Sequence, residues 1–107
     1  MSRFAEAVAR LTATIERRRG AEPNSSYTAQ LLADPARAAK KLGEEAVETA
    51  IAAIQADKDA LAGESADLIY HWLVLLAATG VSLDDVADKL EGREGTSGLD
   101  EKAGRPA

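Results

Sequence analysis

The apolar positions near the start of the chain predict an amphipathic helix. They recur at intervals of four, three and four residues, at Phe4, Val8, Leu11 and Ile15. A helix with 3.6 residues per turn brings positions with this spacing onto one face. We expect this helix to run from about Ser2 to Arg19, because Gly20 follows a basic last turn.

Two further helices are expected before residue 57. A loop over 20–25 leads to Ser25 or Ser26, either of which can cap a short helix over 27–33. Asp34 is well placed as an N-cap with Pro35 at the first helical position, which predicts a third helix to about Ala56. Its apolar stripe is expected to face the core and comprises Val47, Ala50, Ile51 and Ile54.

The fourth predicted helix, from about Asp59 to Ala78, changes character along its length. Residues 68–76 are apolar on every side, and a helix of this kind must be enclosed by others. A domain this small offers too few helices, so we expect this half to pack against a second copy of the chain, in a homodimer. A fifth helix is predicted to begin at Ser82, with Asp85 in the capping-box position.

Composition favours one all-α domain. The chain has 107 residues, of which 46% are hydrophobic and only 4% aromatic, a balance typical of helical proteins. We expect a bundle of four to five helices over residues 1–91. Residues 92–107 contain four glycines and no periodicity, so this tail is predicted to be disordered.

Charge and cysteine content exclude several functions. A net charge of -5 disfavours nonspecific binding to nucleic acid or to an anionic membrane. The absence of cysteine excludes thiolate zinc sites and cysteine nucleophiles. The apolar stretch over 68–78 is too short to span a bilayer. Glu6 and Glu16 in the first helix fit neither a signal nor a transit peptide, so a cytoplasmic location is expected.

Two short clusters of carboxylates dominate the candidate chemistry. The first comprises Glu44, Glu45 and Glu48, and the second comprises Glu64 and Asp67. Helical spacing directs each cluster to one side, and only Lys41, one turn upstream, compensates the first cluster. A solvated acidic surface and a site for a hard divalent cation both remain open at this point.

The fifteen residues between the clusters allow the third helix to end and the fourth to return antiparallel. Four carboxylates on two facing helices could then hold one Mg²⁺: Glu45, Glu48, Glu64 and Asp67. Glu44 could orient or deprotonate a water, or share a second ion. The ammonium of Lys41 could meet a phosphate oxygen. Ordinary pairing with a nearby glutamate is the alternative, and it is less favoured because Lys41 lies on the acidic stripe.

The ordered motifs resemble a known family. Glu-Glu-x-x-Glu at 44–48, followed by Glu-x-x-Asp at 64–67, is similar to the signature of the MazG-like all-α nucleoside triphosphate pyrophosphohydrolases. The segments over 26–31 (Ser-Tyr-Thr-Ala-Gln-Leu), 41–48, 66–71 and 80–83 resemble the phosphoribosyl-ATP pyrophosphohydrolases of histidine biosynthesis. The resemblance covers about residues 4–91.

This resemblance implies Mg²⁺-dependent hydrolysis of 1-(5-phosphoribosyl)-ATP to the corresponding AMP compound and pyrophosphate. It implies that Glu45, Glu48, Glu64 and Asp67 are metal ligands, and that Glu44 acts on the water or on a second metal. It also implies a substrate-binding role for Ser26, Tyr27 and Thr28. The chain departs from relatives that carry consecutive arginines after the last helix, because Glu91-Gly92-Arg93 stands there.

Two other functions remain open from the sequence. One is a house-cleaning pyrophosphohydrolase that acts on nonstandard nucleoside triphosphates with the same metal site. The other is a non-enzymatic dimerisation module whose acids are surface charge only. His71, one turn after Asp67, is interpreted as a hydrogen-bonded core residue or a support for a ligand, in preference to a direct Mg²⁺ ligand.

Overall fold

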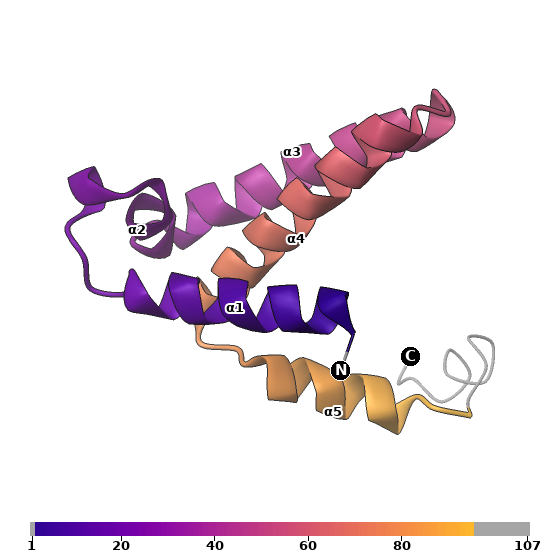
Figure 1. The fold of residues 1–107 in the computed structure, drawn as a ribbon. Helices are drawn as coiled ribbons and strands as arrows, with labels where there is room; N and C mark the ends of the chain where they lie inside the picture. Colours follow the sequence, from indigo (N-terminus) through magenta and orange to yellow (C-terminus); the bar gives the residue numbers. More distant parts are fainter. Residues whose placement is uncertain (1, 96–107) are drawn as a thin grey trace, which may run out of the picture.

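The computed structural model describes residues 2–95, and within this range the chain is helical and contains no strand. The helices are α1 (Arg3–Arg17), α2 (Tyr27–Leu32), α3 (Pro35–Ile54), α4 (Lys58–Thr79) and α5 (Leu83–Gly92) (Figure 1). The predicted all-α class is confirmed. Helix α5 includes Gly92, where the tail was predicted to begin, and residues 96–107 of that tail lie outside the described residues.

The predicted helix starts are confirmed by their caps. The backbone N–H of Arg37 donates to Oδ1 of Asp34 at 3.1 Å, which fixes the start of α3. Ser82 and Asp85 form a reciprocal capping box at the start of α5, with bonds of 3.0 and 2.9 Å. The loop before α2 differs from the prediction, because residues Pro23–Ser25 form a 3-10 helix. Proline at the start of that segment has the fixed φ that such a turn requires.

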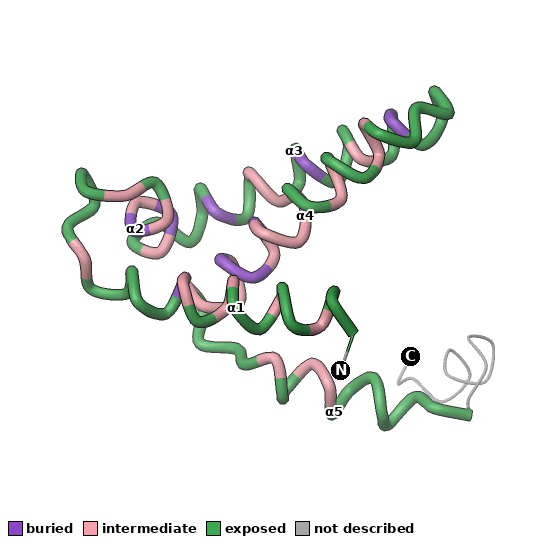
Figure 2. The backbone as a smooth tube through the Cα atoms, viewed as in Figure 1, coloured by how far each residue is buried: buried purple, intermediate pink, exposed green. Residues whose placement is uncertain are grey.

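Helices α3 and α4 form a long antiparallel hairpin, which is the most extensive helix pair in the described fold (Figure 1). Helix α1 packs on α4, and α2 packs on both α3 and α4. The buried core lies where these four helices meet and consists of Ile15, Leu31, Ala38, Leu73 and Val74. Buried residues gather at that junction, whereas the far end of the hairpin is mostly exposed (Figure 2).

The apolar stripe of α3 does not face the core, contrary to the prediction. Val47, Ile51 and Ile54 are 60%, 49% and 87% exposed, and at 100° per residue they lie opposite the side that packs on α4. That inner side carries Ala38, Glu45 and Ala52, all of them buried. The sequence pattern therefore identified an apolar face correctly but assigned it to the wrong side of the hairpin.

The apolar half of α4 is only partly enclosed by the chain itself. Leu73 and Val74 are 4% and 0% exposed, whereas Leu75 and Leu76 are half-buried. Among residues 2–95, no single helix is long and apolar enough to cross a membrane; α4 and α5 reach that composition only together, across a 106° bend.

Candidate active site

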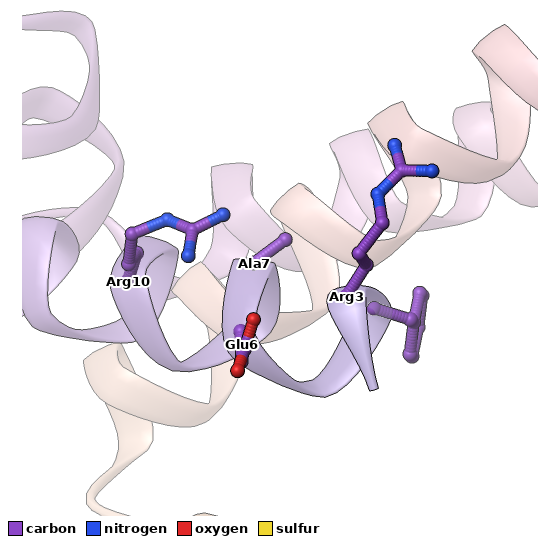
Figure 3. Close-up of a pocket in the computed structure, with 5 residues that line it drawn as sticks. Arg3, Glu6, Ala7 and Arg10 are labelled. Carbon is purple, nitrogen blue, oxygen red and sulfur yellow. The ribbon is translucent and has the colours of Figure 1, made fainter. Parts of the chain in front are cut away.

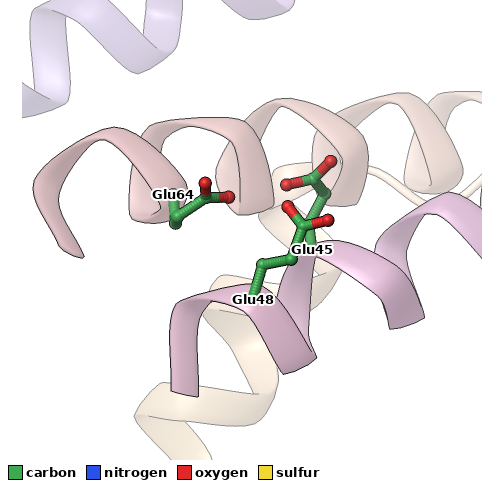
Figure 4. Close-up of side chains that lie close together, drawn as sticks. All are labelled: Glu45, Glu48 and Glu64. Carbon is green, nitrogen blue, oxygen red and sulfur yellow. The ribbon is translucent and has the colours of Figure 1, made fainter. Parts of the chain in front are cut away.

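Three carboxylates from the two helices of the hairpin converge on one point. Glu45 and Glu48 project from α3, and Glu64 projects toward them from α4 (Figure 4). One carboxylate oxygen from each of the three lies within 4.8 Å of the other two. The predicted antiparallel return of the fourth helix thus brings members of both acidic clusters together.

The turn between α3 and α4 sets this geometry. Ala56 adopts a left-handed conformation with φ of 58°. The backbone N–H of Asp57 donates to the carbonyl of Ala52 at 3.2 Å, and that of Ala56 donates to Ala53 at 3.1 Å. These bonds form a Schellman motif, which reverses the chain directly after α3. Asp57 then caps α4 by accepting from the N–H of Ala60 at 3.0 Å.

The three carboxylates change one another's protonation. The close approach of the Glu48 carboxylate is the main reason that the pKa of Glu64 is raised to about 7, and burial and Glu45 add to it. Burial is the main cause that raises the pKa of Glu45, and the negative charge of Glu48 contributes. Like charges this close disfavour the ionised forms. A cation at this point would relieve the repulsion.

The buried oxygens support the same conclusion. Oε2 of Glu45 and Oε2 of Glu64 are buried and have no hydrogen-bond partner among the described residues. Buried polar atoms in folded proteins nearly always have a partner. Carboxylate oxygens are the donors that Mg²⁺ prefers. The residues present therefore fit a hard divalent cation held between α3 and α4.

Two predicted site acids lie outside this group of three. Asp67 is one turn further along α4 and is exposed, although its charge contributes to the raised pKa of Glu45. Glu44 forms an ion pair with Lys41, with Oε2 3.2 Å from Nζ. That pairing is the alternative that the sequence made less favoured for Lys41. The predicted roles of Glu44 and Asp67 stay predictions.

The predicted substrate residues lie on and beside α2. The hydroxyl of Ser26 accepts from the N–H of Ala29 at 3.2 Å and so caps this helix. Thr28 shares a hydrogen bond of 2.5 Å with the hydroxyl of Tyr70 on α4. Tyr27 is 42% exposed and is therefore available to a ligand. Of these three residues, Tyr27 alone has an exposed side chain that neither caps helix α2 nor ties it to α4.

Lys41 links α2 with the carboxylates. Its hydrogen bond and attraction to Glu44 raise the pKa of Lys41, and Tyr27 and Glu45 add smaller contributions. The Lys41 ammonium is therefore within electrostatic range of both the exposed tyrosine and Glu45. A polyphosphate at the carboxylates would find this ammonium beside it.

Arg37 was not singled out from the sequence. Its guanidinium lies over the ring of Tyr27, 5.5 Å from the centroid, and donates to Oε1 of Gln30 at 3.3 Å. An arginine in the first turn of a helix opposes the helix dipole. That unfavourable placement was the available signal that Arg37 has another partner.

His71 lies against the carboxylates and is 6% exposed. Its Nε2 is 4.0 Å from Oε1 of Glu45, and its Nδ1 is buried without a partner among the described residues. Burial and, to a lesser degree, the charge of Lys41 lower the pKa of His71. Its burial agrees with the prediction of a core or supporting residue, whereas the predicted hydrogen bond of a core histidine is not formed among the described residues.

A surface hollow of about 460 Å³ lies elsewhere, beside the first half of α1. Arg3, Ala7 and Arg10 point from one side of that helix, and Glu6 points away from them (Figure 3). Its lining comes from a single helix and includes none of the three carboxylates. The hollow is therefore separate from the candidate site.

Comparison with known proteins shows which family the chain resembles. The model of the phosphoribosyl-ATP pyrophosphohydrolase family matches residues 8–94. A phosphoribosyl-ATP pyrophosphatase of Caulobacter sp. (strain K31) is 70% identical over 100% of both chains. The protein of the same name from Caulobacter vibrioides (strain NA1000 / CB15N) is 68% identical over 96% of each chain.

A more distant relative extends the match. A phosphoribosyl-ATP pyrophosphatase of Cereibacter sphaeroides (strain KD131 / KCTC 12085) is 57% identical over 90% of this chain and 94% of its own length. The family match spans both carboxylate clusters and α2. The chain belongs to the phosphoribosyl-ATP pyrophosphohydrolase family.

Proposed function

We propose that this chain hydrolyses 1-(5-phosphoribosyl)-ATP to 1-(5-phosphoribosyl)-AMP and pyrophosphate, the second step of histidine biosynthesis. The observation that carries the proposal is the convergence of Glu45, Glu48 and Glu64 within a chain that matches this family over residues 8–94. In the reaction, water attacks the α or the β phosphorus, and the P–O bond from the attacked phosphorus to the bridging oxygen breaks. Either attack gives pyrophosphate and the AMP compound.

The proposal includes Mg²⁺ as the cofactor, held by Glu45, Glu48 and Glu64, with Asp67 as the fourth ligand. The uncompensated charge of the carboxylates and the unpartnered oxygens of Glu45 and Glu64 support it. When bound, the ion supplies positive charge that offsets the negative charge on the polyphosphate as the anhydride breaks.

The remaining roles belong to side chains around the carboxylates. Glu44, once released from its ion pair with Lys41, orients or deprotonates the attacking water. The freed ammonium of Lys41 then pairs with a phosphate oxygen. The exposed ring of Tyr27 offers a surface on which adenine stacks. Ser26 and Thr28 shape the loop by capping α2 and by bonding to Tyr70.

The proposed enzyme is a homodimer. Large apolar side chains on the outer side of α3 support this, because Val47, Ile51 and Ile54 are all exposed in the single chain. Leu75 and Leu76 of α4 are also only half-buried. Exposed apolar residues that gather on one helix face mark an interface more often than an ordinary surface.

Pyrophosphate release is the direct test. Purified protein with Mg²⁺ should release pyrophosphate from phosphoribosyl-ATP much faster than from ATP or from nonstandard triphosphates such as dITP. The Glu48→Gln variant, which keeps the side-chain shape but removes a charge, serves as the control and should release pyrophosphate much more slowly at the same Mg²⁺ concentration. Faster release from nonstandard triphosphates would identify a house-cleaning pyrophosphohydrolase instead. No release from any of these substrates would leave the non-enzymatic dimerisation module.

A further inference from the structure

We propose that His71 is a positioning residue for Glu45: its Nε2–H donates to Oε1 of Glu45 and thereby directs Oε2 of the same carboxylate toward the cation. This inference rests on the proposed metal site. It assigns a separate task to each oxygen of Glu45 and leaves His71 outside the set of metal ligands.

The first support is the arrangement of buried atoms. His71 and Glu45 are 6% and 9% exposed, so water has little access to either side chain. Oε1 of Glu45 faces Nε2 of His71 at 4.0 Å, while Oε2 has no hydrogen-bond partner among the described residues. One oxygen is therefore next to a donor, and the other remains available for a ligand.

The second support is the way that the ring is held. Tyr70 packs edge-on against the imidazole with centroids 4.9 Å apart, and Tyr27 does so at 6.3 Å. The hydroxyl of Tyr70 is itself tied to Thr28 on α2 by a 2.5 Å hydrogen bond. Rings packed in this way restrict the imidazole, so that Nε2 keeps facing Glu45.

The present separation is longer than a hydrogen bond. A typical N–H···O bond spans about 2.9 Å between heavy atoms, so the pair must approach by about 1 Å. The inference therefore requires the Glu45 carboxylate to turn toward the ring when the cation is bound. Hydrogen bonds from supporting residues to metal-binding carboxylates fix their orientation, and losing one weakens metal affinity by about 10- to 100-fold.

Three substitutions separate positioning from packing. His71→Gln places an amide N–H close to the position of Nε2, whereas His71→Asn places it close to that of Nδ1. His71→Met fills a similar volume with no N–H donor. The readout is Mn²⁺ affinity of each protein without substrate, measured by electron paramagnetic resonance, together with kcat and KM for phosphoribosyl-ATP and the melting temperature in EDTA.

We expect His71→Gln to bind Mn²⁺ within about 3-fold of the wild type, and His71→Asn and His71→Met to bind about 10- to 100-fold more weakly. In the latter two variants kcat should fall at low Mg²⁺ and recover partly at high Mg²⁺, with KM little changed. Wild-type Mn²⁺ affinity in both His71→Asn and His71→Met would overturn the inference. Equal weakening in all three variants would also overturn it, since that indicates packing alone.

The metal site can fail separately from the role of His71. If the wild type binds no Mn²⁺, the proposed metal site is wrong, and the inference falls with it. If the wild type binds Mn²⁺ and the variants do not differ from it, only the role of His71 is wrong. The comparison of Gln with Asn remains valid if the Met variant does not fold, because both amides are polar and of similar size.

Discussion

The carboxyl group of Glu64 on α4 lies within 4.8 Å of that of Glu48 on α3, and this contact raises the pKa of Glu64 to about 7. The two helices thus approach each other through groups that repel when both are ionised. The hairpin tolerates this repulsion because burial of Ala38, Leu73 and Val74 stabilises its other end. Strain of this kind at a functional site is relieved by the ligand that the site binds.

The pH dependence of stability without metal follows from this pair. The pKa of Glu64 rises from 4.5 to about 7 on folding. Between pH 4.5 and about 7 the folded state therefore binds more protons than the unfolded state. The free energy of unfolding falls as pH rises through this range. Glu64→Gln is neutral at every pH, so in EDTA it should match the wild type near pH 5 and melt at a higher temperature at pH 8.

Comparing the two proteins at each pH removes the opposing effect of His71, whose pKa is lowered. Because folded His71 takes up a proton less readily than unfolded His71, the free energy of unfolding falls as pH drops below the ordinary histidine pKa. This fall is the same in both proteins. Excess Mg²⁺ should reverse the order at pH 8, because the wild type alone gains binding energy from a complete site. A melting difference that does not change between pH 5 and 8 would contradict this account.

Replacing single acids tests which of them hold the ion. Glu45→Ala and Asp67→Ala should each lower turnover by at least about 100-fold. Helical content should stay intact, and the melting temperature in EDTA should stay equal or rise, because one repelling charge is gone. The exposed Asp88 on α5 offers a matched control, and Asp88→Ala should change neither quantity. Turnover near the wild-type value would remove that acid from the site.

The outer face of α3 should control assembly. Ile51→Lys places a charge within the exposed apolar stripe, and desolvating that charge in an interface costs more than the interface gains. Light scattering at micromolar concentration should give a dimer for the wild type and a monomer for this variant. Leu90→Lys, which changes a 62% exposed leucine on α5, should remain dimeric. A monomeric wild type would contradict the proposed assembly.

The turn after α3 is a site where stability can be raised. Ala56 has φ of 58°, whereas the equivalent turn after α4 uses Gly80 with φ of 79°. A left-handed conformation costs a residue with a Cβ about 1 kcal/mol, so Ala56→Gly should stabilise the fold by about that amount. Ala9→Gly, at an exposed position in the middle of α1, should destabilise it by about 0.5–1 kcal/mol. Urea unfolding measures the change in the free energy of unfolding for both variants. Changes of the same sign would contradict this interpretation of the turn.

Local signals in the sequence predicted most of the helices. Asp34-Pro35 and Ser82 with Asp85 are short-range patterns whose hydrogen bonds form within one turn, and the structure has them where they were expected. Pairing of the two acidic clusters was also predictable, because the length of the connection limits where α4 can return. The predicted loop over 20–25 was wrong in part, because it contains the 3-10 helix at Pro23–Ser25.

Long-range packing explains what the sequence could not reveal. The stripe with Val47 and Ile51 has the periodicity of a core face, but periodicity does not say which neighbour covers it. The contact between Thr28 and Tyr70 joins residues far apart in the chain, and no local pattern encodes it. The raised pKa of Glu64 likewise depends on a separation across two helices, which only the folded hairpin defines.

The most direct test of a metal site between α3 and α4 is the rate of pyrophosphate release from phosphoribosyl-ATP as Mg²⁺ is restored to metal-stripped protein. We predict no turnover in EDTA and a saturable rise with Mg²⁺, with Glu48→Gln requiring much more of the ion than the wild type. Full turnover in EDTA, or an identical Mg²⁺ dependence in the wild type and Glu48→Gln, would contradict the account.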